Sequence, residues 1–218
     1  MRRTKQQSEA TRRHILASAR RVFARRGVTR STLDHIAEAA GVTRGAIYWH
    51  FDNKLAVFEA MRELVTLPLV DRTDFASLNV TEPDPLDAIE SFLRDLLASI
   101  ENDRATRQTF EIAILKCEYV DEFEPELKRQ ARRCQELLAK LTTTYRRAKR
   151  AGLLRDDLTP ETAALETCAF VTGLFRLCLI DRNGTLIRKR VNALIAAHVQ
   201  GRRGSPTQAS RKMTRRGA

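Results

Sequence analysis

The sequence is poor in the residues that interrupt helices, with nine glycines and six prolines among 218 residues. The alternation of apolar and polar residues that marks a half-buried strand is also absent. Instead, apolar residues recur at spacings of three and four almost throughout, which is the spacing of one face of a helix. The sequence therefore predicts an all-α fold, and its 43% hydrophobic content is enough to bury a core.

Cysteines are few: Cys117, Cys134, Cys168 and Cys178. They form no CxxC pair and have no histidine nearby at metal-ligand spacing, so neither a disulfide framework nor a zinc site is indicated. Cys168 and Cys178 fall on one predicted helix about 15 Å apart, which is too far for a disulfide. We expect four buried, reduced thiols.

Long apolar runs are missing as well, since no stretch approaches the roughly 18 consecutive apolar residues that a membrane-spanning helix needs. Residues 1–8 carry charges but are followed by no apolar segment of the kind found in signal peptides. We therefore expect a soluble protein that stays in the cytoplasm and has no membrane partner.

Catalytic motifs are not recognisable. The sequence contains no Ser/His/Asp or Cys/His constellation, no glycine-rich phosphate loop and no cluster of metal ligands. Its four histidines are scattered, at His14, His35, His50 and His198. These absences argue against an enzyme, and we expect no catalytic residue, no cofactor and no bound metal.

Positive charge is present and is concentrated at the two ends of the chain. Residues 1–54 hold 12 Lys/Arg against four Asp/Glu, residues 55–200 hold 21 against 23, and residues 201–218 hold six against none. A basic segment beside a near-neutral body suggests a domain that binds a polyanion, with nucleic acid the first candidate and an anionic membrane the second. Improved solubility is the plain alternative.

Capping signals and apolar spacing divide the chain into about nine helices. Ser31 and Asp34 have the spacing of a capping box, Gly27 and Gly41 are placed to end helices, and Pro68 should end or kink the fourth helix. The predicted helices cover approximately residues 9–26, 33–41, 43–51, 54 to beyond 64, 86–101, 104–117, 122–151, 160–180 and 185–199. The polar stretch 79–85 is expected to be a loop.

Residues 32–51 have the form of a helix-turn-helix, in which two short helices flank a glycine turn. Gly41 can adopt the left-handed conformation that a sharp turn requires. Successive helical residues point about 100° apart, so Tyr48 and Trp49 face outward, beside the bare backbone of Gly45, when Ile47 faces the core. This outward face is the surface that would enter a DNA major groove.

Recognition helices contact base edges mainly with their N-terminal residues, which makes Thr43 and Arg44 the candidates for direct readout, supported by Tyr48. Thr32, His50 and Lys54 are better suited to phosphates, because helix N-terminal amides and cations both bind anions. Each residue has a structural alternative. The aromatic residues could belong to the core, His50 could be a solvated loop residue, and Lys54 could be an ordinary surface charge. The predicted DNA-binding residues are Thr32, Thr43, Arg44, Gly45, Tyr48, Trp49, His50 and Lys54.

The block from Ile15 to Lys54, and above all Thr43-Arg44-Gly45-Ala46-Ile47-Tyr48-Trp49-His50-Phe51-Asp52-Asn53-Lys54, resembles the DNA-binding domain of the TetR/AcrR family of bacterial repressors. The rest of the chain resembles, more loosely, members that repress multidrug efflux pump genes, including Arg3-Thr4-Lys5 and the patch Lys116-Cys117-Glu118-Tyr119. The resemblance implies a three-helix DNA-binding head and a helical ligand-binding and dimerisation domain. It also implies a two-fold homodimer on a pseudopalindromic DNA operator.

This reading predicts four parts: a basic arm at 1–8, the DNA-binding domain at 9–54, the ligand-binding and dimerisation domain at 55–200, and a basic disordered tail at 201–218. By resemblance, a small hydrophobic or amphipathic ligand enters the second domain, displaces the fourth helix and weakens operator binding. The arm and the tail could each add contacts to DNA, although a tail without function is an equal alternative.

Candidate ligand-binding residues fall at helical spacings and mix apolar with weakly polar groups, although the same spacings are typical of plain core. They are Leu96, Phe110, Ile114, Leu137, Leu141, Cys168, Val171, Thr172 and Phe175. The candidates for a four-helix dimer interface are Gly173, Leu177, Ile180, Leu194 and Ile195. A regulator of a metabolic operon that senses one metabolite is the alternative to an efflux repressor, and a nonspecific architectural DNA-binding protein is a more distant one.

Overall fold

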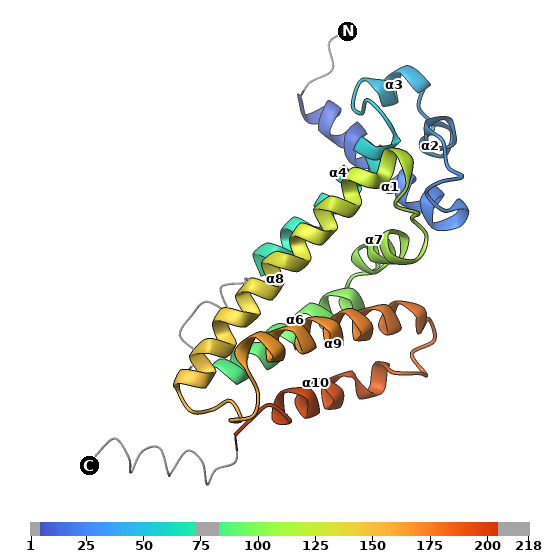
Figure 1. The fold of residues 1–218 in the computed structure, drawn as a ribbon. Helices are drawn as coiled ribbons and strands as arrows, with labels where there is room; N and C mark the ends of the chain where they lie inside the picture. Colours follow the sequence, from blue (N-terminus) through green and yellow to red (C-terminus); the bar gives the residue numbers. More distant parts are fainter. Residues whose placement is uncertain (1–4, 73–82, 205–218) are drawn as a thin grey trace, which may run out of the picture. The chain divides into compact units, whose positions relative to one another are not determined.

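The computed structural model describes residues 5–72 and 83–204, without the side chains of residues 66–72. Within these residues the protein is helical, with one isolated β-bridge between Leu154 and Arg203, and the predicted all-α fold is confirmed (Figure 1). The elements are α1 Lys5–Arg26, α2 Leu33–Ala40, α3 Arg44–Tyr48, α4 Lys54–Arg72, α6 Pro85–Asn102, α7 Arg104–Leu115, η1 Asp121–Phe123, α8 Glu124–Arg150, α9 Pro160–Ile180, η2 Arg188–Arg190 and α10 Val191–Gln200.

The chain divides into two compact units, and each consists of two stretches of sequence. The head unit comprises residues 1–68 and 100–129, and the body unit comprises residues 69–99 and 130–218. The helix-turn-helix therefore shares a compact unit with α7, η1 and the first turns of α8. The predicted boundary between residues 54 and 55 falls inside the head unit, because the sequence gives no sign that a distant segment packs against the first helices.

The core of the head unit is formed by one face of each of its helices. The predicted inward residues of α1, Ile15, Ala19, Val22 and Phe23, are all buried. They pack in one cluster with residues of α2, α3, α4, α7 and η1. The members from the later elements include Ile36, Ile47, Val57, Phe58, Met61, Ile112 and Phe123. Burial of these apolar side chains is the main force that holds the helix-turn-helix in place.

A salt-free anchor joins α1 to the segment that follows α7. The ammonium of Lys116 donates to the carbonyl oxygen of Ala24 at 2.5 Å, and the backbone N–H of Val28 donates to the carbonyl oxygen of Lys116 at 3.0 Å. A cation at a helix C-terminus is favourable because the last carbonyls carry partial negative charge. The patch that includes Lys116 is therefore part of the packing of the head unit.

The body unit contains a buried polar chain between α8, α9 and α10. The hydroxyls of Tyr145 and Thr167 lie 2.7 Å apart, and the Thr167 hydroxyl lies 2.9 Å from Nε2 of His198. The His198 ring also stacks on Phe170, with 3.9 Å between ring centroids. Burial, with a smaller effect of the nearby charge of Arg202, lowers the pKa of His198 to about 4. The chain is therefore uncharged at neutral pH.

Several predicted boundaries require correction. Thr32, not Ser31, caps α2, because the Ser31 hydroxyl is buried and donates to the carbonyl oxygen of Gly27 at 2.6 Å. The helix α4 does not end at Pro68 but continues to Arg72. A proline removes one backbone hydrogen bond, and the remaining turns can continue the helix.

The last helix begins six residues later than predicted, at Val191. The carboxylate of Asp181 accepts hydrogen bonds from four backbone N–H groups of the preceding connection, at residues 185–188. These bonds lower the pKa of Asp181 to about 2. They also hold residues 185–188 in a tight connection, so these residues do not join the helix.

The body unit extends four residues into the segment predicted to be a disordered tail. Residues 201–204 are folded: Gly204 donates its N–H to the carbonyl oxygen of Leu153 at 2.8 Å, and Arg203 forms ion pairs with Asp84 and Asp87. The arginine signals a charged tail in the sequence, but it is neutralised by residues more than 100 positions away. The remainder of the predicted tail, 205–218, and arm residues 1–4 lie outside the described residues, as do residues 79–82 of the predicted loop.

Two further expectations concern cysteines and membranes. All four cysteines are free, but only Cys178 is buried, whereas Cys134 is exposed. Burial raises the pKa of the half-buried Cys117 to about 11, so its thiol is protonated at neutral pH. The helix α9 is long and apolar enough, by length and composition, to cross a membrane, and 44% of its apolar window is buried within the fold.

Candidate DNA-binding site and effector residues

The helix-turn-helix is fixed by caps at each of its internal ends. Thr32 accepts a hydrogen bond from the N–H of His35 at 3.2 Å, and the His35 ring accepts one from the N–H of Thr32 at 3.3 Å, which completes a capping box. Gly41 follows α2 with a φ of 61°, in the left-handed region expected from the sequence. Thr43 then caps α3 by accepting from the N–H of Ala46 at 3.2 Å.

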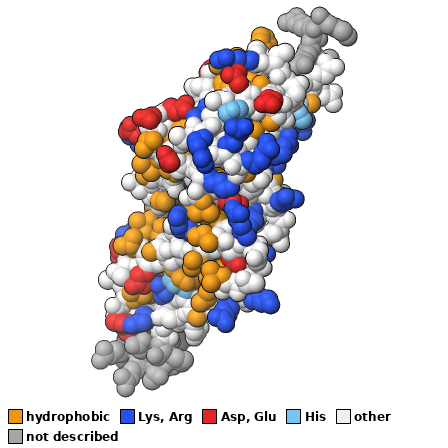
Figure 2. Space-filling model, turned by 90° about the vertical axis from the view of Figure 1, so that its right-hand side faces the viewer, with side chains coloured by type: hydrophobic (Ala, Val, Ile, Leu, Met, Phe, Trp, Pro, Cys, Tyr) orange, Lys and Arg blue, Asp and Glu red, His pale blue; other side chains and the backbone are white. Residues whose placement is uncertain are grey.

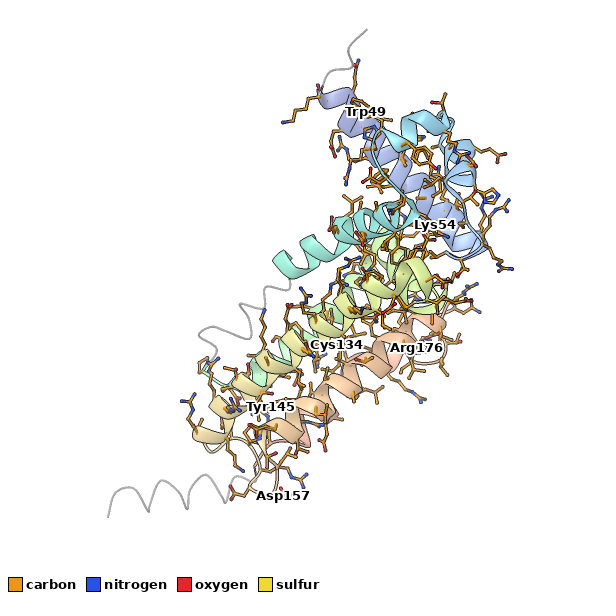
Figure 3. The ribbon with its side chains drawn as sticks, turned by 45° about the horizontal axis from the view of Figure 1, so that its top comes forward. Trp49, Lys54, Cys134, Tyr145, Asp157 and Arg176 are labelled. Atoms are coloured by element: carbon orange, nitrogen blue, oxygen red, sulfur yellow. The ribbon has the colours of Figure 1, made fainter. Side chains whose placement is uncertain are left out.

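These caps orient α3 so that one face is buried and the other is open. Ile47 is fully buried, whereas Tyr48 is 45% exposed and Trp49 is 81% exposed. Gly45 is exposed between them, and the space around its missing side chain is open to within 4 Å. The predicted outward direction of Tyr48 and Trp49 is confirmed, and Figure 3 shows Trp49 at the free edge of the head unit. An exposed tryptophan of this size has no role in the core of the protomer.

The guanidinium of Arg44 is held in the open by two neighbours. Its Nη2 donates to the hydroxyl of Tyr48 at 3.3 Å, and its Nε lies 3.4 Å from Oδ1 of Asp34 on α2. The contacts with Tyr48 and Asp34 raise the pKa of Arg44 further, so it is permanently charged. The sequence analysis missed Asp34 because residues ten positions apart on different helices leave no periodic signal.

The three residues predicted to bind phosphates occupy different settings. Thr32 is exposed at the start of α2, where its hydroxyl is used in the cap. His50 is half-buried beside Phe51. The ammonium of Lys54 is 15% exposed and lies 3.0 Å from the carboxylate of Glu122 and 3.3 Å from the carbonyl oxygen of Thr29. Lys54 is therefore neither an ordinary surface charge nor a freely available cation.

Positive side chains gather on the head unit around this face. Figure 2 shows Lys and Arg side chains close together in the upper part of the surface that it displays. Exposed members of the set on α1 and in the connection to α2 include Arg13, Arg21, Arg25, Arg26 and Arg30. Such a surface attracts the phosphate backbone of DNA without selecting a sequence.

The predicted ligand-binding residues are divided between the units. Phe110 and Ile114 lie in the head unit on α7, and both are half-buried. The other seven lie in the body unit, where Leu141, Val171 and Phe175 are buried and Leu96, Leu137 and Cys168 are half-buried. Thr172 is exposed and donates to the carbonyl oxygen of Cys168, so it lies on the outer face of α9.

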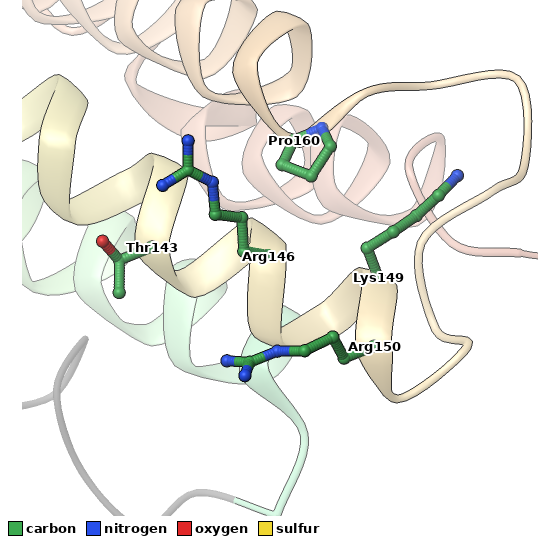
Figure 4. Close-up of a pocket in the computed structure, with 5 residues that line it drawn as sticks. All are labelled: Thr143, Arg146, Lys149, Arg150 and Pro160. Atoms are coloured by element: carbon green, nitrogen blue, oxygen red, sulfur yellow. The ribbon is translucent and has the colours of Figure 1, made fainter.

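A described pocket of about 420 Å³ lies in the body unit at the end of α8 and the start of α9 (Figure 4). Its lining contains none of the predicted ligand-binding residues and consists of Thr143, Arg146, Lys149, Arg150 and Pro160. Arg146 pairs with Glu161 at 2.8 Å, and Lys149 donates to three carbonyl oxygens that end the connection between the helices. These cations stabilise the helix ends, and the pocket is not suited to a hydrophobic compound.

Four of the five predicted dimer residues lie on the surface of α9 and α10. Leu177, Ile180 and Leu194 are 42%, 50% and 37% exposed, and Gly173 is also exposed. Figure 2 shows hydrophobic side chains in the lower part of the displayed face. Ile195 is fully buried, so it belongs to the core of the protomer. Leu165 and Leu186, which the sequence analysis did not select, are exposed to a greater extent, at 60% and 62%.

A helix-turn-helix with an exposed recognition face, set in an all-helical chain, defines a DNA-binding regulator. The family of bacterial regulatory proteins called the tetR family matches residues 15–61, and the C-terminal region of MAATS-type transcriptional repressors matches residues 84–201. This protein belongs to the TetR family and is a transcriptional regulator of the kind that carries a MAATS-type C-terminus. The family is not enzymatic.

Its relatives include repressors of multidrug efflux pumps. The regulator TtgR of Pseudomonas putida is 37% identical over 83% of this chain and 85% of its own length. NalD, the secondary repressor of the MexAB-OprM multidrug efflux pump in Pseudomonas aeruginosa, is 29% identical, with a TM-score of 0.79 and coverage of 91% and 98% of the two chains. The complex of SmeT from Stenotrophomonas maltophilia with triclosan is 28% identical, with a TM-score of 0.75 and coverage of 90% and 93%.

Proposed function

We propose that this protein is a cytoplasmic, dimeric repressor that binds a pseudopalindromic operator, controls a multidrug efflux operon and is released by small hydrophobic compounds. The exposed recognition face of α3 is the observation that carries this proposal. Arg44 and Tyr48 stand together at the N-terminal half of α3, where recognition helices contact base edges. Thr43 and Gly45 flank Arg44 and leave room for the backbone of α3 to approach the groove.

The roles of the remaining residues follow from their surroundings. Trp49, Thr32 and His50 lie where they can contact the sugar-phosphate backbone, which positions the protein without selecting sequence. Lys54 can reach a phosphate only by leaving Glu122, so we propose that its main contribution is to the packing of the head unit.

Dimerisation is supported by the outer face of α9 and α10. Contiguous apolar patches on a protein surface generally mark an interaction site, and two copies of an apolar helix pair form a four-helix interface related by a two-fold axis. The residues that we assign to it are Gly173, Leu177, Ile180 and Leu194, joined by Leu165 and Leu186. A dimer places two recognition helices on half-sites about 34 to 36 Å apart.

The class of ligand is supported by the relatives. NalD represses a multidrug efflux pump, and SmeT binds triclosan. The apolar side chains of the body unit agree with a hydrophobic ligand, and Leu96, Leu137, Leu141, Cys168, Val171 and Phe175 remain its candidates there, with Phe110 and Ile114 on α7. Thr172 is the weakest candidate because it is exposed. A metabolic regulator that senses one metabolite is the alternative.

The decisive experiment is a titration of the purified protein with the DNA upstream of its own gene and of any adjacent transporter operon, with random DNA as competitor at physiological salt. We expect binding at least about 1,000-fold tighter to one of these sites than to random DNA. Equal affinity for all the DNAs would contradict a local repressor.

The same complex then tests the ligand class. We expect triclosan and chemically unrelated hydrophobic compounds to lower operator affinity about tenfold or more, which corresponds to about 1.4 kcal/mol of coupling. Release by a single polar metabolite, with no effect of any hydrophobic compound, would favour the metabolic alternative.

A further inference from the structure

The outer face of α4 meets η1 and the start of α8 along a row of matched side chains in the head unit. Lys54 pairs with Glu122 at 3.0 Å, and the rings of Phe58 and Phe123 meet edge to face at 5.4 Å. One turn further on, Arg62 forms an ion pair with Glu126, and the row ends where Glu59 pairs with Arg129. We call these eight residues the α4–α8 seam.

The centre of the seam is a buried ion pair. The side chains of Arg62 and Glu126 are 9% and 1% exposed, so both charges are removed from water. Glu126 also accepts a hydrogen bond from Nε of Arg129 at 2.9 Å, and the guanidinium of Arg62 lies 6.0 Å from the centroid of the Phe58 ring. A buried ion pair seldom adds stability over an apolar pair of the same size, but it does penalise every arrangement that separates the charges.

The helix α4 carries this seam on one side and the core of the DNA-binding head on the other. Val57 and Met61 of α4 are buried in the same cluster as Phe23 of α1 and Ile47 of α3. Any displacement of α4 therefore shifts the packing beneath the recognition helix, because close-packed interiors transmit small movements.

The helix α8 starts at the seam and continues without interruption to Arg150. Its later turns carry Leu141 and Tyr145, which are buried in the body unit and hold α8 to that unit's core. A continuous helix of 27 residues moves as a stiff rod over its whole length. A change in the packing around Leu141 therefore reaches Glu126 through the helix itself.

We propose that the α4–α8 seam is the joint through which α8 sets the position of the recognition helix, with Arg62 and Glu126 as positioning residues that never touch DNA. This inference rests on the proposed operator binding. It assigns to the first turns of α8 a role that the sequence analysis placed only in the contact of the fourth helix with α1.

The test replaces both charges by apolar side chains of similar volume, as R62M/E126L. This change keeps the net charge of the protein and leaves no unpaired buried charge, so we expect it to fold with a wild-type circular dichroism spectrum. The matched control is E124Q/K128M. Glu124 and Lys128 lie on the same turns of α8, pair at 3.0 Å, and are 61% and 74% exposed.

The readout is the ratio of operator affinity to affinity for random DNA, measured on one preparation of each variant. We expect R62M/E126L to lower this ratio about tenfold while the control stays within twofold of the unaltered protein. A merely structural role would reduce the folded fraction and weaken both affinities alike, which leaves the ratio unchanged. An unchanged ratio in folded R62M/E126L would overturn the proposal.

A second measurement uses no DNA, so the two hypotheses can fail separately. L141A loosens the body unit around α8, and hydrogen exchange is then followed at the amides of α4. We expect L141A to speed exchange at residues 54–65 at least threefold in the unaltered seam and to have no such effect in R62M/E126L. Equal acceleration in both backgrounds would overturn the seam as the joint, whereas absence of any operator for the unaltered protein would overturn only the proposed function.

Discussion

The two units of this protein differ in where they place charge. The head unit buries the ion pair of Arg62 with Glu126 and exposes cations and aromatic rings around α3. The body unit buries the uncharged chain of Tyr145, Thr167 and His198 and exposes leucines on α9 and α10. An outer surface of cations suits a polyanion, whereas an outer surface of leucines suits a second apolar surface.

The interiors differ for a related reason. A buried ion pair fixes one arrangement, because separating the charges is costly, whereas a chain of hydroxyls and a neutral ring can adjust with smaller penalties. The head unit is therefore built to hold one orientation of its recognition helix, and the body unit can accommodate changes in packing. The predictions below each test one side of this comparison.

The largest effect is expected from L177E on the exposed face of α9. A carboxylate in the proposed interface would have to lose its water, so the dimer should dissociate. Because two linked half-sites bind far more tightly than one, operator affinity should fall by about 100-fold or more. Sedimentation and operator titration measure both effects. L127E, at a leucine of α8 that is 47% exposed, is the control, and dimeric L177E would refute the assigned interface.

A smaller but still large effect is expected from R44A on α3. Loss of an arginine that contacts a base costs about 1 to 3 kcal/mol, which is roughly 5- to 150-fold in operator affinity. Affinity for random DNA should change much less, so the specificity ratio falls. K128A removes an exposed cation of α8 and serves as the control. Equal losses on operator and random DNA would show that Arg44 contacts phosphate alone.

The pH dependence of stability should report on His198 in the body unit. The pKa of this residue is lowered from 6.5 to about 4, so the unfolded chain binds its proton more readily than the folded protein does. Stability is then complete above about pH 6.5 and declines as the pH falls from about 6.5 to 4. We expect the melting temperature to follow this course, measured by thermal unfolding.

The variant H198Q separates this residue from the other titrating groups. It removes the ring that titrates, so the decline between pH 6.5 and about 5 should become shallower than in the unaltered protein. Asp181 does not interfere in this range because its pKa is about 2. An identical pH profile for H198Q would mean that another group causes the decline.

The smallest effect is expected from D34N beside the recognition helix. Asp34 holds the Arg44 guanidinium through an exposed contact, and exposed ion pairs contribute only about 0.2 to 1 kcal/mol. We expect the specificity ratio to fall up to about fivefold as Arg44 loses its preferred orientation. E38Q removes an equal charge from the same helix and should leave the ratio unchanged. Matching changes in the two variants would indicate a general effect of charge.

Local rules explain why so much of the head unit could be predicted from the sequence. The turn needs a left-handed residue, and Gly41 provides it at a φ of 61°. Ile47 and Tyr48 differ by one position and therefore by about 100° around the helix, so the burial of one exposes the other. These relations involve neighbours in the chain and need no knowledge of the tertiary structure.

Long-range contacts account for what the sequence analysis missed or placed wrongly. Lys54 looks like a surface cation until Glu122 is seen beside it, and Arg203 looks like part of a tail until it meets Asp84. Ile195 follows the helical spacing of an interface residue and is nevertheless buried in its own protomer. Spacing along a helix gives the face on which a residue lies, but not what covers that face.

The sequence by itself therefore determined the all-helical class, the helix-turn-helix and the outward direction of Tyr48 and Trp49, because periodicity and turn chemistry are properties of short segments. Only the tertiary structure decided that α7 and the start of α8 join the head unit, and that Arg62 and Glu126 meet in its interior. Those partners are 64 positions apart in the chain. Their contact depends on how whole helices pack, which no local pattern records.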